Sequence, residues 1–317
     1  MQSRSLPVNE WGMMTNSLRK QMWFAFCVFL FAFVVRLLSA WLFPNIGWPD
    51  ELYQSVEQAH RFVYGYGIIP IEFQNGMRSW LLPGFLSLVI WCTQFFGEGS
   101  TGYLFGISFA LCFLSALTIP SVILFSEELK EKINVRYLLL ITLPMICWFD
   151  FVYFAPKALS EVVSTHLLFP GLLLGYLARQ NTDRKLYWGV GFLLGLSLML
   201  RIQLAPVVFA SALYFCRFDL SKKWKHFLLG AFVPVVLAGL VDWLTWSSPF
   251  WSYRLYLWKH IVKKHSSGDG MSVWYYYFAV LFEVLGWWIL PLTLLSIFGA
   301  CKKPFLMFVA ILHLIVH

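Results

Sequence analysis

QMWFAFCVFLFAFVVRLLSAWLF, residues 21–43, is an apolar run long enough to cross a bilayer as a helix. A membrane-spanning helix needs about 20 mainly apolar residues. No small-residue cleavage site follows the run, so it predicts a retained first span rather than a signal peptide. Arg4, Arg19 and Lys20 precede it. Because Lys and Arg are enriched on the cytoplasmic side, these residues predict a cytoplasmic N-terminus.

The composition extends this prediction to the whole chain. Of the 317 residues, 59% are hydrophobic and 13% are charged, whereas about a quarter of a soluble domain is charged. An integral membrane protein with a single domain over residues 1–317 is therefore predicted. The net charge of +8 does not indicate nucleic acid, because Lys and Arg lie in short loops between apolar segments. We expect the lipid bilayer as a partner, and no nucleic acid.

Further apolar segments predict an all-α, polytopic fold with about nine spans. The expected spans are 21–43, 102–125, 137–154, 162–178, 186–200, 203–216, 227–246, 277–300 and a last one that starts at 305. An additional apolar segment, 80–97, is of borderline length and carries Pro83 near its start. Whether this segment crosses the membrane decides the topology of everything that follows it.

If residues 80–97 cross, three basic loops face outward, contrary to the positive-inside rule. These loops are 126–136, 179–185 and 217–226. If residues 80–97 instead lie in the outer interface, the three loops and Lys302–Lys303 become cytoplasmic. We therefore predict a long first outer loop, about 44–100, that carries helices parallel to the membrane. A second outer segment is predicted at about 247–276.

The first strongly polar stretch is WPDELYQSVEQAHRFVYGYG at 48–67, directly after the first span. Its adjacent carboxylates, Asp50 and Glu51, have two interpretations. Pro49 suits the first turn of a helix, so Asp50 could be an ordinary N-terminal helix residue with Glu51 on a solvated face. However, charge at or near membrane depth is costly and tends to mark a site. We therefore predict that Asp50 is a general base, with Glu51 beside it.

Cations are predicted on the same outer face. Lys157 and Arg201 each interrupt apolar sequence near the end of a predicted span, and Arg78 lies in the first outer loop. Taken singly, each is more simply explained as a snorkelling or interface residue. Together with a base they suit transfer from a lipid phosphate. The base deprotonates an acceptor hydroxyl, and the cations stabilise the phosphate as it leaves.

No motif indicates nucleotide or metal chemistry. GYGIIP at 65–70 lacks the third glycine of a dinucleotide fingerprint, and there is no Walker A, H-E-x-x-H or G-x-S-x-G motif. The six cysteines are scattered singly, without the spacing of a zinc site. We expect no metal and no cofactor, and a sugar donor that arrives already linked to a lipid.

The first outer loop resembles that of the multi-spanning mannosyltransferases that build GPI anchors and lipid-linked oligosaccharides. Their pattern is Pro-Asp-Glu-x-x-Gln-x-x-Glu-x-x-His, followed by Tyr-Gly and by Arg-Ser before Pro. The residues that match it in order are Pro49, Asp50, Glu51, Gln54, Glu57, His60, Tyr66, Gly67, Arg78, Ser79 and Pro83. KALSEV at 157–162 is similar to the family's Arg-x-x-Ser-Glu segment, with Lys157 in place of Arg and with Glu161.

This resemblance implies the GT-C fold of glycosyltransferase family 22. It implies transfer of a sugar, mannose above all, from dolichyl or polyprenyl phosphate to a hydroxyl of a glycan or glycolipid. The base falls on Asp50 with Glu51 second, and the cations predicted at the donor phosphate are Lys157, Arg201 and Arg78. The residues expected to contact the acceptor or support the loop are Gln54, Glu57, His60 and Glu161.

Two further expectations follow from the resemblance. The site lies on the periplasmic face of a bacterial inner membrane, or on the lumenal face of the endoplasmic reticulum in a eukaryote. The chain stops inside an apolar run, where such proteins continue, which predicts a truncated C-terminus.

Two other functions stay open at this point. A transporter or flippase for a lipid-linked saccharide uses the same cations and aromatics without a base, but it predicts two related halves with interrupted spans. No such repeat is present in the sequence. A transferase of another sugar, or of a phospho-group, from the same lipid carrier is the second alternative.

Overall fold

The computed structural model describes residues 16–128, 135–180, 183–217, 222–259 and 275–316. Within these ranges the chain is helical and contains no strand, which confirms the all-α prediction. The helices of the first half are α1 (Asn16–Leu42), the π-helix η1 (Glu51–Val56), α2 (Glu57–Tyr64), α3 (Ile71–Gln74), α4 (Leu81–Thr93), η2 (Gln94–Phe96), α5 (Thr101–Ala116), α6 (Thr118–Glu128), α7 (Val135–Cys147) and α8 (Phe149–Tyr153). Those of the second half are α9 (Ser160–Gln180), α10 (Arg184–Leu200), η3 (Ile202–Leu204), α11 (Ala205–Cys216), α12 (Lys222–Trp246), α13 (Trp251–Leu257), α14 (Tyr276–Leu285), η6 (Gly286–Trp288), α15 (Ile289–Lys302) and α16 (Pro304–Val316).

Several helices have the length and apolar character of membrane spans. Among the described residues, five segments qualify: Met22–Leu42, Thr101–Ile123, Ser160–Gln180, Lys223–Trp246 and Ala279–Lys302. The other expected spans fall on shorter helices, namely α7, α10, α11 and α16. The chain is therefore a polytopic, integral membrane protein.

Two glycines allow α10 and α12 to approach very closely. A Cβ atom at Gly191 would lie 2.0 Å from the carbonyl oxygen of Phe227, and one at Gly230 would lie 2.0 Å from that of Trp188. Small residues let helix backbones meet in a membrane, where van der Waals packing drives association. On its other side α10 packs against α9. This tight packing fixes the C-terminal end of α10, where Arg201 follows.

Arg36 ties α1 to two other helices. Its side chain is 1% exposed and donates hydrogen bonds to Ser115 Oγ at 3.1 Å and to the carbonyl oxygen of Met145 at 2.9 Å. A third bond runs to the carbonyl oxygen of Ala32 at 3.2 Å. Because a charge in an apolar bundle is costly unless its donors are satisfied, these bonds explain how Arg36 is accommodated inside the first span.

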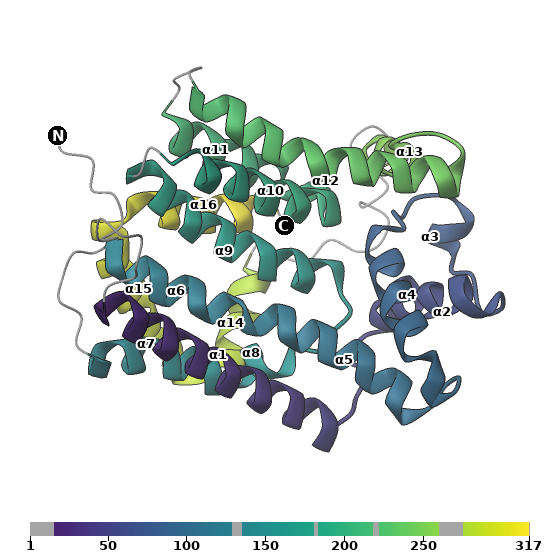
Figure 1. The fold of residues 1–317 in the computed structure, drawn as a ribbon, viewed down its shortest axis with the longest axis horizontal. Coiled ribbons are helices and arrows are strands. Elements are labelled where there is room, and N and C mark those ends of the chain that lie inside the picture. The colour runs from purple at the N-terminus through teal and green to yellow at the C-terminus, as the bar shows by residue number, and fades with distance from the viewer. Residues whose placement is uncertain (1–15, 129–134, 181–182, 218–221, 260–274, 317) are drawn as a thin grey trace.

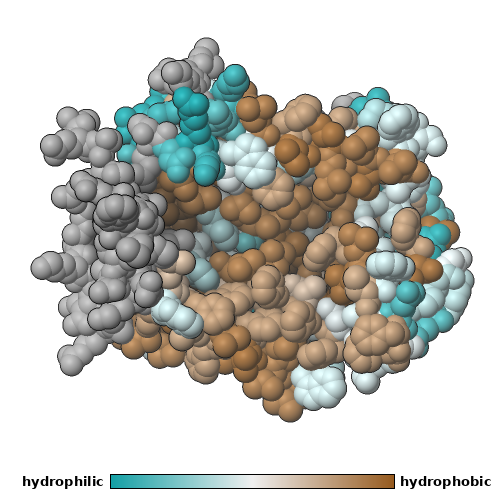
Figure 2. All heavy atoms as spheres, viewed as in Figure 1, coloured by the Kyte–Doolittle hydropathy of each residue, from teal (hydrophilic) through white to brown (hydrophobic). Residues whose placement is uncertain are grey.

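The described helices of both expected outer segments lie together at one end of the bundle, and residues 260–274 of the second segment lie outside the described residues. Figure 1 shows α2, α3, α4 and α13 together at the right-hand end of the long helices. The segment 80–97 forms α4 and η2, and α4 packs against α2 through Ala59, Leu86 and Ile90. Figure 2 shows a brown, hydrophobic band over the middle of the molecule, with hydrophilic side chains at the same right-hand end. A polar end beside an apolar band is the arrangement expected for a site at a membrane surface.

Candidate active site

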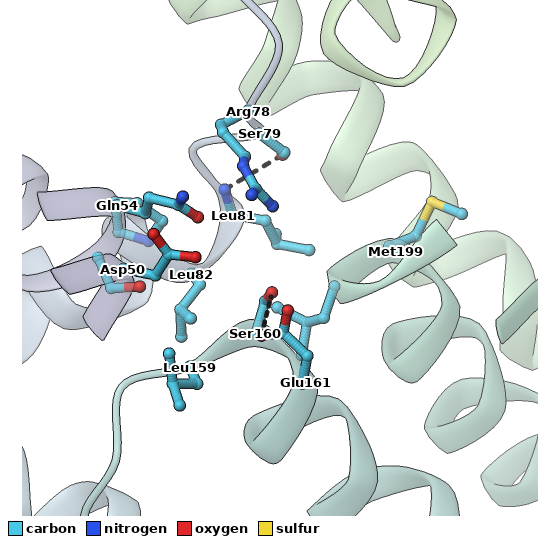
Figure 3. Close-up of a pocket in the computed structure, with 13 residues that line it drawn as sticks. Asp50, Gln54, Arg78, Ser79, Leu81, Leu82, Leu159, Ser160, Glu161 and Met199 are labelled. Atoms are coloured by element: carbon cyan, nitrogen blue, oxygen red, sulfur yellow. Dashed lines mark hydrogen bonds between the residues drawn. The ribbon is translucent and has the colours of Figure 1, made fainter. Parts of the chain in front are cut away.

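A small pocket opens between η1, the loop before α4 and the start of α9 (Figure 3). Its volume is about 60 Å³. The residues that line it are Asp50, Gln54, Ser55, Arg78, Ser79, Leu81, Leu82, Pro83, Leu159, Ser160, Glu161, Met199 and Leu200. The pocket therefore joins the segment between α1 and α5 to the ends of two long helices.

Asp50 presents an unpaired carboxylate to this pocket. The residue occupies the N-cap position of η1, but its side chain makes no capping hydrogen bond. No hydrogen bond or ion pair joins it to any other residue that the structure describes. The carboxylate is exposed and has no protein partner, so it is open to a ligand, and its role as a base stays a prediction.

Arg78 faces the same pocket with an unpaired cation. Its carbonyl oxygen accepts a hydrogen bond from Trp246 Nε1 at 3.3 Å, which holds the loop against α12. Figure 3 shows the guanidinium pointing into the space that the Asp50 carboxylate also faces. Within the described residues, the guanidinium and the carboxylate form no ion pair with each other. Charges of opposite sign thus flank an open space rather than neutralise one another.

A second pocket continues the first. It shares Arg78, Ser79, Ser160, Met199 and Leu200 with it, and its volume is about 50 Å³. The further lining residues are Met77, Arg201, Ile202, Gln203, Ser252, Tyr253 and Tyr256. We call the two connected pockets the polar cleft.

Arg201 lies at the far end of the polar cleft. It follows the last residue of α10, and its guanidinium forms an ion pair with Glu161 of α9. Its Nε atom is buried and has no partner among the described residues. Arg201 therefore brings a second guanidinium to the polar cleft, one that is already paired with Glu161.

The α13 wall of the polar cleft is held by hydrogen bonds that the sequence did not predict. Tyr253 Oη donates to the carbonyl oxygen of Met199 at 2.7 Å. The fully buried Asp242 of α12 accepts from Ser252 N at 2.9 Å and from Ser252 Oγ at 2.6 Å. Burial raises the pKa of the Tyr256 phenol, while Arg201 and Arg78 lower it in part. The one sequence signal for this wall was a carboxylate, Asp242, inside an apolar span.

Glu51 and Lys157 do not line the polar cleft. They border a larger, mainly apolar cavity of about 1000 Å³. Glu51 Oε2 lies 3.5 Å from Lys157 Nζ, and Lys157 Nζ donates to both oxygens of Asn45. The structure therefore separates Glu51 and Lys157 from Asp50, Arg78 and Arg201, with which the sequence had grouped them.

Three other predicted residues make contacts within the segment between α1 and α5. Gln54 Nε2 donates to Glu72 Oε1 at 3.2 Å. Glu57 Oε1 accepts from the backbone N–H of Ile68 at 2.7 Å, and His60 Nε2 lies 2.9 Å from Glu98 Oε1. Of these, Gln54 lines the polar cleft. Their catalytic or acceptor roles stay predictions.

Metal ligands do not cluster in the ranges that the structure covers. No group of three or more His, Cys, Asp or Glu side chains there is placed to hold a metal ion. The chemistry that the polar cleft offers is that of two carboxylates, Asp50 and Glu161, two guanidinium groups and several hydroxyls.

Comparison with known proteins gives a family match over nearly the whole chain. The sequence model described as "Alg9-like mannosyltransferase family" matches residues 27–317. GPI alpha-1,2-mannosyltransferase 3 of Homo sapiens is 23% identical over 290 residues, which are 89% of this chain and 51% of the relative. The chain thus spans about half the length of that relative.

Two other relatives match over shorter stretches of the chain but with higher sequence identity. Mannosyltransferase APTG1 of Arabidopsis thaliana is 43% identical over 56 residues, 18% of this chain and 10% of the relative. GPI mannosyltransferase 3 of Trypanosoma brucei brucei is 31% identical over 90 residues, 28% of this chain and 16% of the relative. No solved structure matches the chain.

Proposed function

The chain belongs to the Alg9-like mannosyltransferase family, and we propose that it transfers mannose from a polyprenyl or dolichyl phosphate to a hydroxyl of a glycan or glycolipid. The observation that carries this proposal is the pair of unpaired, opposite charges, Asp50 and Arg78, that face one pocket. A base and a phosphate-binding cation are the two groups that the reaction needs.

The proposed reaction is a direct displacement at C1 of the donor sugar. Asp50 takes the proton of the acceptor hydroxyl, and the acceptor oxygen forms the new bond to C1. The bond between C1 and the phosphate oxygen breaks, and its electron pair leaves with the lipid phosphate. Attack opposite to the leaving group inverts the configuration at C1.

The cations of the polar cleft would hold the phosphate. Guanidinium groups bind phosphate oxygens through paired, charge-assisted hydrogen bonds. Arg78 has its whole guanidinium group available, whereas the guanidinium of Arg201 is already paired with Glu161. Glu161, which already pairs with Arg201, orients that side chain. No metal or other cofactor is proposed, since the cations supply the charge that the leaving phosphate requires.

We propose that the polar cleft faces the periplasm or the lumen. α1 runs from its basic start toward the end of the bundle that carries α2, α3 and α4 (Figure 1). With Arg19 and Lys20 cytoplasmic by the positive-inside rule, that end lies on the opposite side of the membrane. The topology of about nine spans, with 80–97 in the outer interface, agrees with this orientation.

Labelled donor tests the reaction. Membranes that contain the protein are incubated with polyprenyl-phosphate [³H]mannose, and lipid and glycan extracts are searched for a labelled product that control membranes do not form. The same assay with polyprenyl-phosphate glucose separates mannose from another sugar. Movement of intact donor across the membrane, without a new glycosidic bond in either assay, would contradict the proposal and support a transporter.

A further inference from the structure

The connection between α1 and η1 is fastened to the segment that leads from α8 to α9. Lys157 Nζ donates to the main-chain oxygen of Asn45 at 2.6 Å and to its side-chain Oδ1 at 2.5 Å. Glu51 Oε2 accepts from the N–H of Gly47 at 3.1 Å and lies 3.5 Å from Lys157 Nζ. We call Asn45, Gly47, Glu51 and Lys157 the Lys157 clamp.

Aromatic contacts hold the same connection along its length. The ring of Trp48 stacks on that of Phe154, with centroids 5.3 Å apart. Lys157 Nζ lies 4.9 Å from the centroid of the Tyr153 ring. A Cβ atom at Gly47 would lie 2.9 Å from Tyr153 Oη, so glycine permits this close approach. The connection is thus pinned at several points to α8 and to the residues after it.

The charged atoms of the clamp are satisfied by each other. Lys157 is 2% exposed and Glu51 is 7% exposed. A buried charge that loses its partner carries the full cost of its desolvation. Lys157 Nζ donates to two oxygen atoms of Asn45 and forms an ion pair with Glu51. A lysine engaged in this way has little capacity left for a phosphate.

The clamp adjoins both walls of the polar cleft. Asp50 immediately precedes Glu51, whose N–H donates to the carbonyl oxygen of Trp48 at 3.1 Å. On the other side, Lys157 is followed within four residues by Ser160 and Glu161, which line the pocket opposite Asp50. One ion pair therefore joins the wall that carries Asp50 to the wall that faces it.

We propose that Glu51 and Lys157 are positioning residues whose pair fixes the carboxylate of Asp50 against the polar cleft, and that neither contacts the donor phosphate. This inference rests on the proposed function, in which Asp50 is the base. Glu51 thus has a positioning role, whereas Asp50 is the base.

The test is a double-mutant cycle on the purified full chain, with polyprenyl-phosphate mannose as the donor. Glu51→Gln and Lys157→Met should each lower kcat by about 10²-fold, the loss that a misplacement of about 1 Å can cause. The KM for the donor should stay within about threefold, since no contact to the donor is removed. The double variant should lose no more than the worse single variant, because the two residues act as a unit.

Three controls keep the result interpretable. Lys157→Arg should restore most of kcat, since a guanidinium can donate to Asn45 and Glu51 at once. Lys185→Met removes an exposed lysine at the opposite end of α10 and should change nothing. If Lys157→Met fails to insert, Asn45→Ala serves in its place, because it removes one acceptor of the clamp. It should also lower kcat at unchanged donor KM, but by a smaller factor.

A rise in donor KM in Lys157→Met, or losses that multiply in the double variant, would overturn the inference and return Lys157 to the phosphate. The coupling is also measured by thermal unfolding, which does not depend on activity. If Asp50→Asn is active while thermal unfolding still shows coupling between Glu51 and Lys157, the assignment of Asp50 as the base is wrong but the Lys157 clamp is supported. If Asp50→Asn is inactive and thermal unfolding shows no coupling between Glu51 and Lys157, the Lys157 clamp is wrong but the assignment of Asp50 as the base is supported.

Discussion

Asp50 and Glu51 are consecutive in the chain, but their carboxylates face two different pockets. Asp50 lines the polar cleft without a partner, whereas Glu51 borders the large apolar cavity and lies 3.5 Å from Lys157 Nζ. The start of η1 therefore divides the two carboxylates between the polar cleft and the apolar cavity.

The first prediction concerns the side of the membrane. Single cysteines in a cysteine-free chain at Tyr66, in the exposed first loop, and at Lys185, at the start of α10, should lie on opposite sides. An impermeant thiol reagent added outside intact cells or sealed lumen-out vesicles should label position 66 at once, and position 185 only after permeabilisation. Labelling of position 185 from outside would mean that 80–97 cross the membrane.

The second prediction concerns the contact between α10 and α12. Gly191→Ala places a Cβ atom 2.0 Å from the carbonyl oxygen of Phe227, so the helices must separate. Overpacking of this kind typically costs about 1–3 kcal/mol, and the thermal unfolding temperature in detergent should fall. Gly299→Ala is the matched control, because nothing lies within 4 Å of the added Cβ. Equal unfolding temperatures for the two variants would contradict the close approach.

The third prediction concerns the α13 wall. Asp242→Ala removes the acceptor of two hydrogen bonds from Ser252 and leaves a buried backbone N–H without a partner. Loss of a side-chain cap of this kind costs about 1–2 kcal/mol of stability. Asp242→Asn keeps one acceptor oxygen and should cost less, as measured by thermal unfolding. A stability of Asp242→Ala equal to that of the unchanged protein would show that Asp242 does not hold α13.

The fourth prediction concerns the phosphate. Arg78→Met and Arg201→Met should each lower kcat by about 10²-fold, the usual effect of removing one preorganised donor from the leaving charge. Arg254→Met is the control, since Arg254 is exposed, donates to Ser248 Oγ and lies outside the polar cleft. If both cleft variants keep the kcat and donor KM of the unchanged protein, the two arginines are structural.

The sequence was sufficient for the fold class and for part of the site. A 23-residue apolar run and a low share of charge require membrane helices, and the described residues form helices and connecting loops without a strand. The Asp50, Arg78 and Arg201 positions could be grouped because each is a charge at the end of an apolar segment. Such charges must reach water or a ligand at the membrane surface, and the structure brings all three to one cleft.

The sequence could not predict which pocket each side chain faces. Lys157 is as conspicuous in apolar sequence as Arg201, and only the packing of the α1–η1 connection on α8 reveals that its partners are Asn45 and Glu51. Tyr253 and Tyr256 are aromatic residues in an aromatic-rich segment, which also suits a membrane-interface belt. Their place in the cleft depends on the bond between Asp242 and Ser252 across two helices.

The most direct measurement is the transfer rate of Asp50→Asn. The Asp50 side chain is exposed and makes no capping hydrogen bond, and asparagine has nearly the same shape, so the variant should insert and unfold like the unchanged protein. Because it cannot accept the proton of the acceptor hydroxyl, its rate with polyprenyl-phosphate mannose should fall by about 10²–10⁴-fold. A rate close to that of the unchanged protein would contradict the assignment of Asp50 as the base.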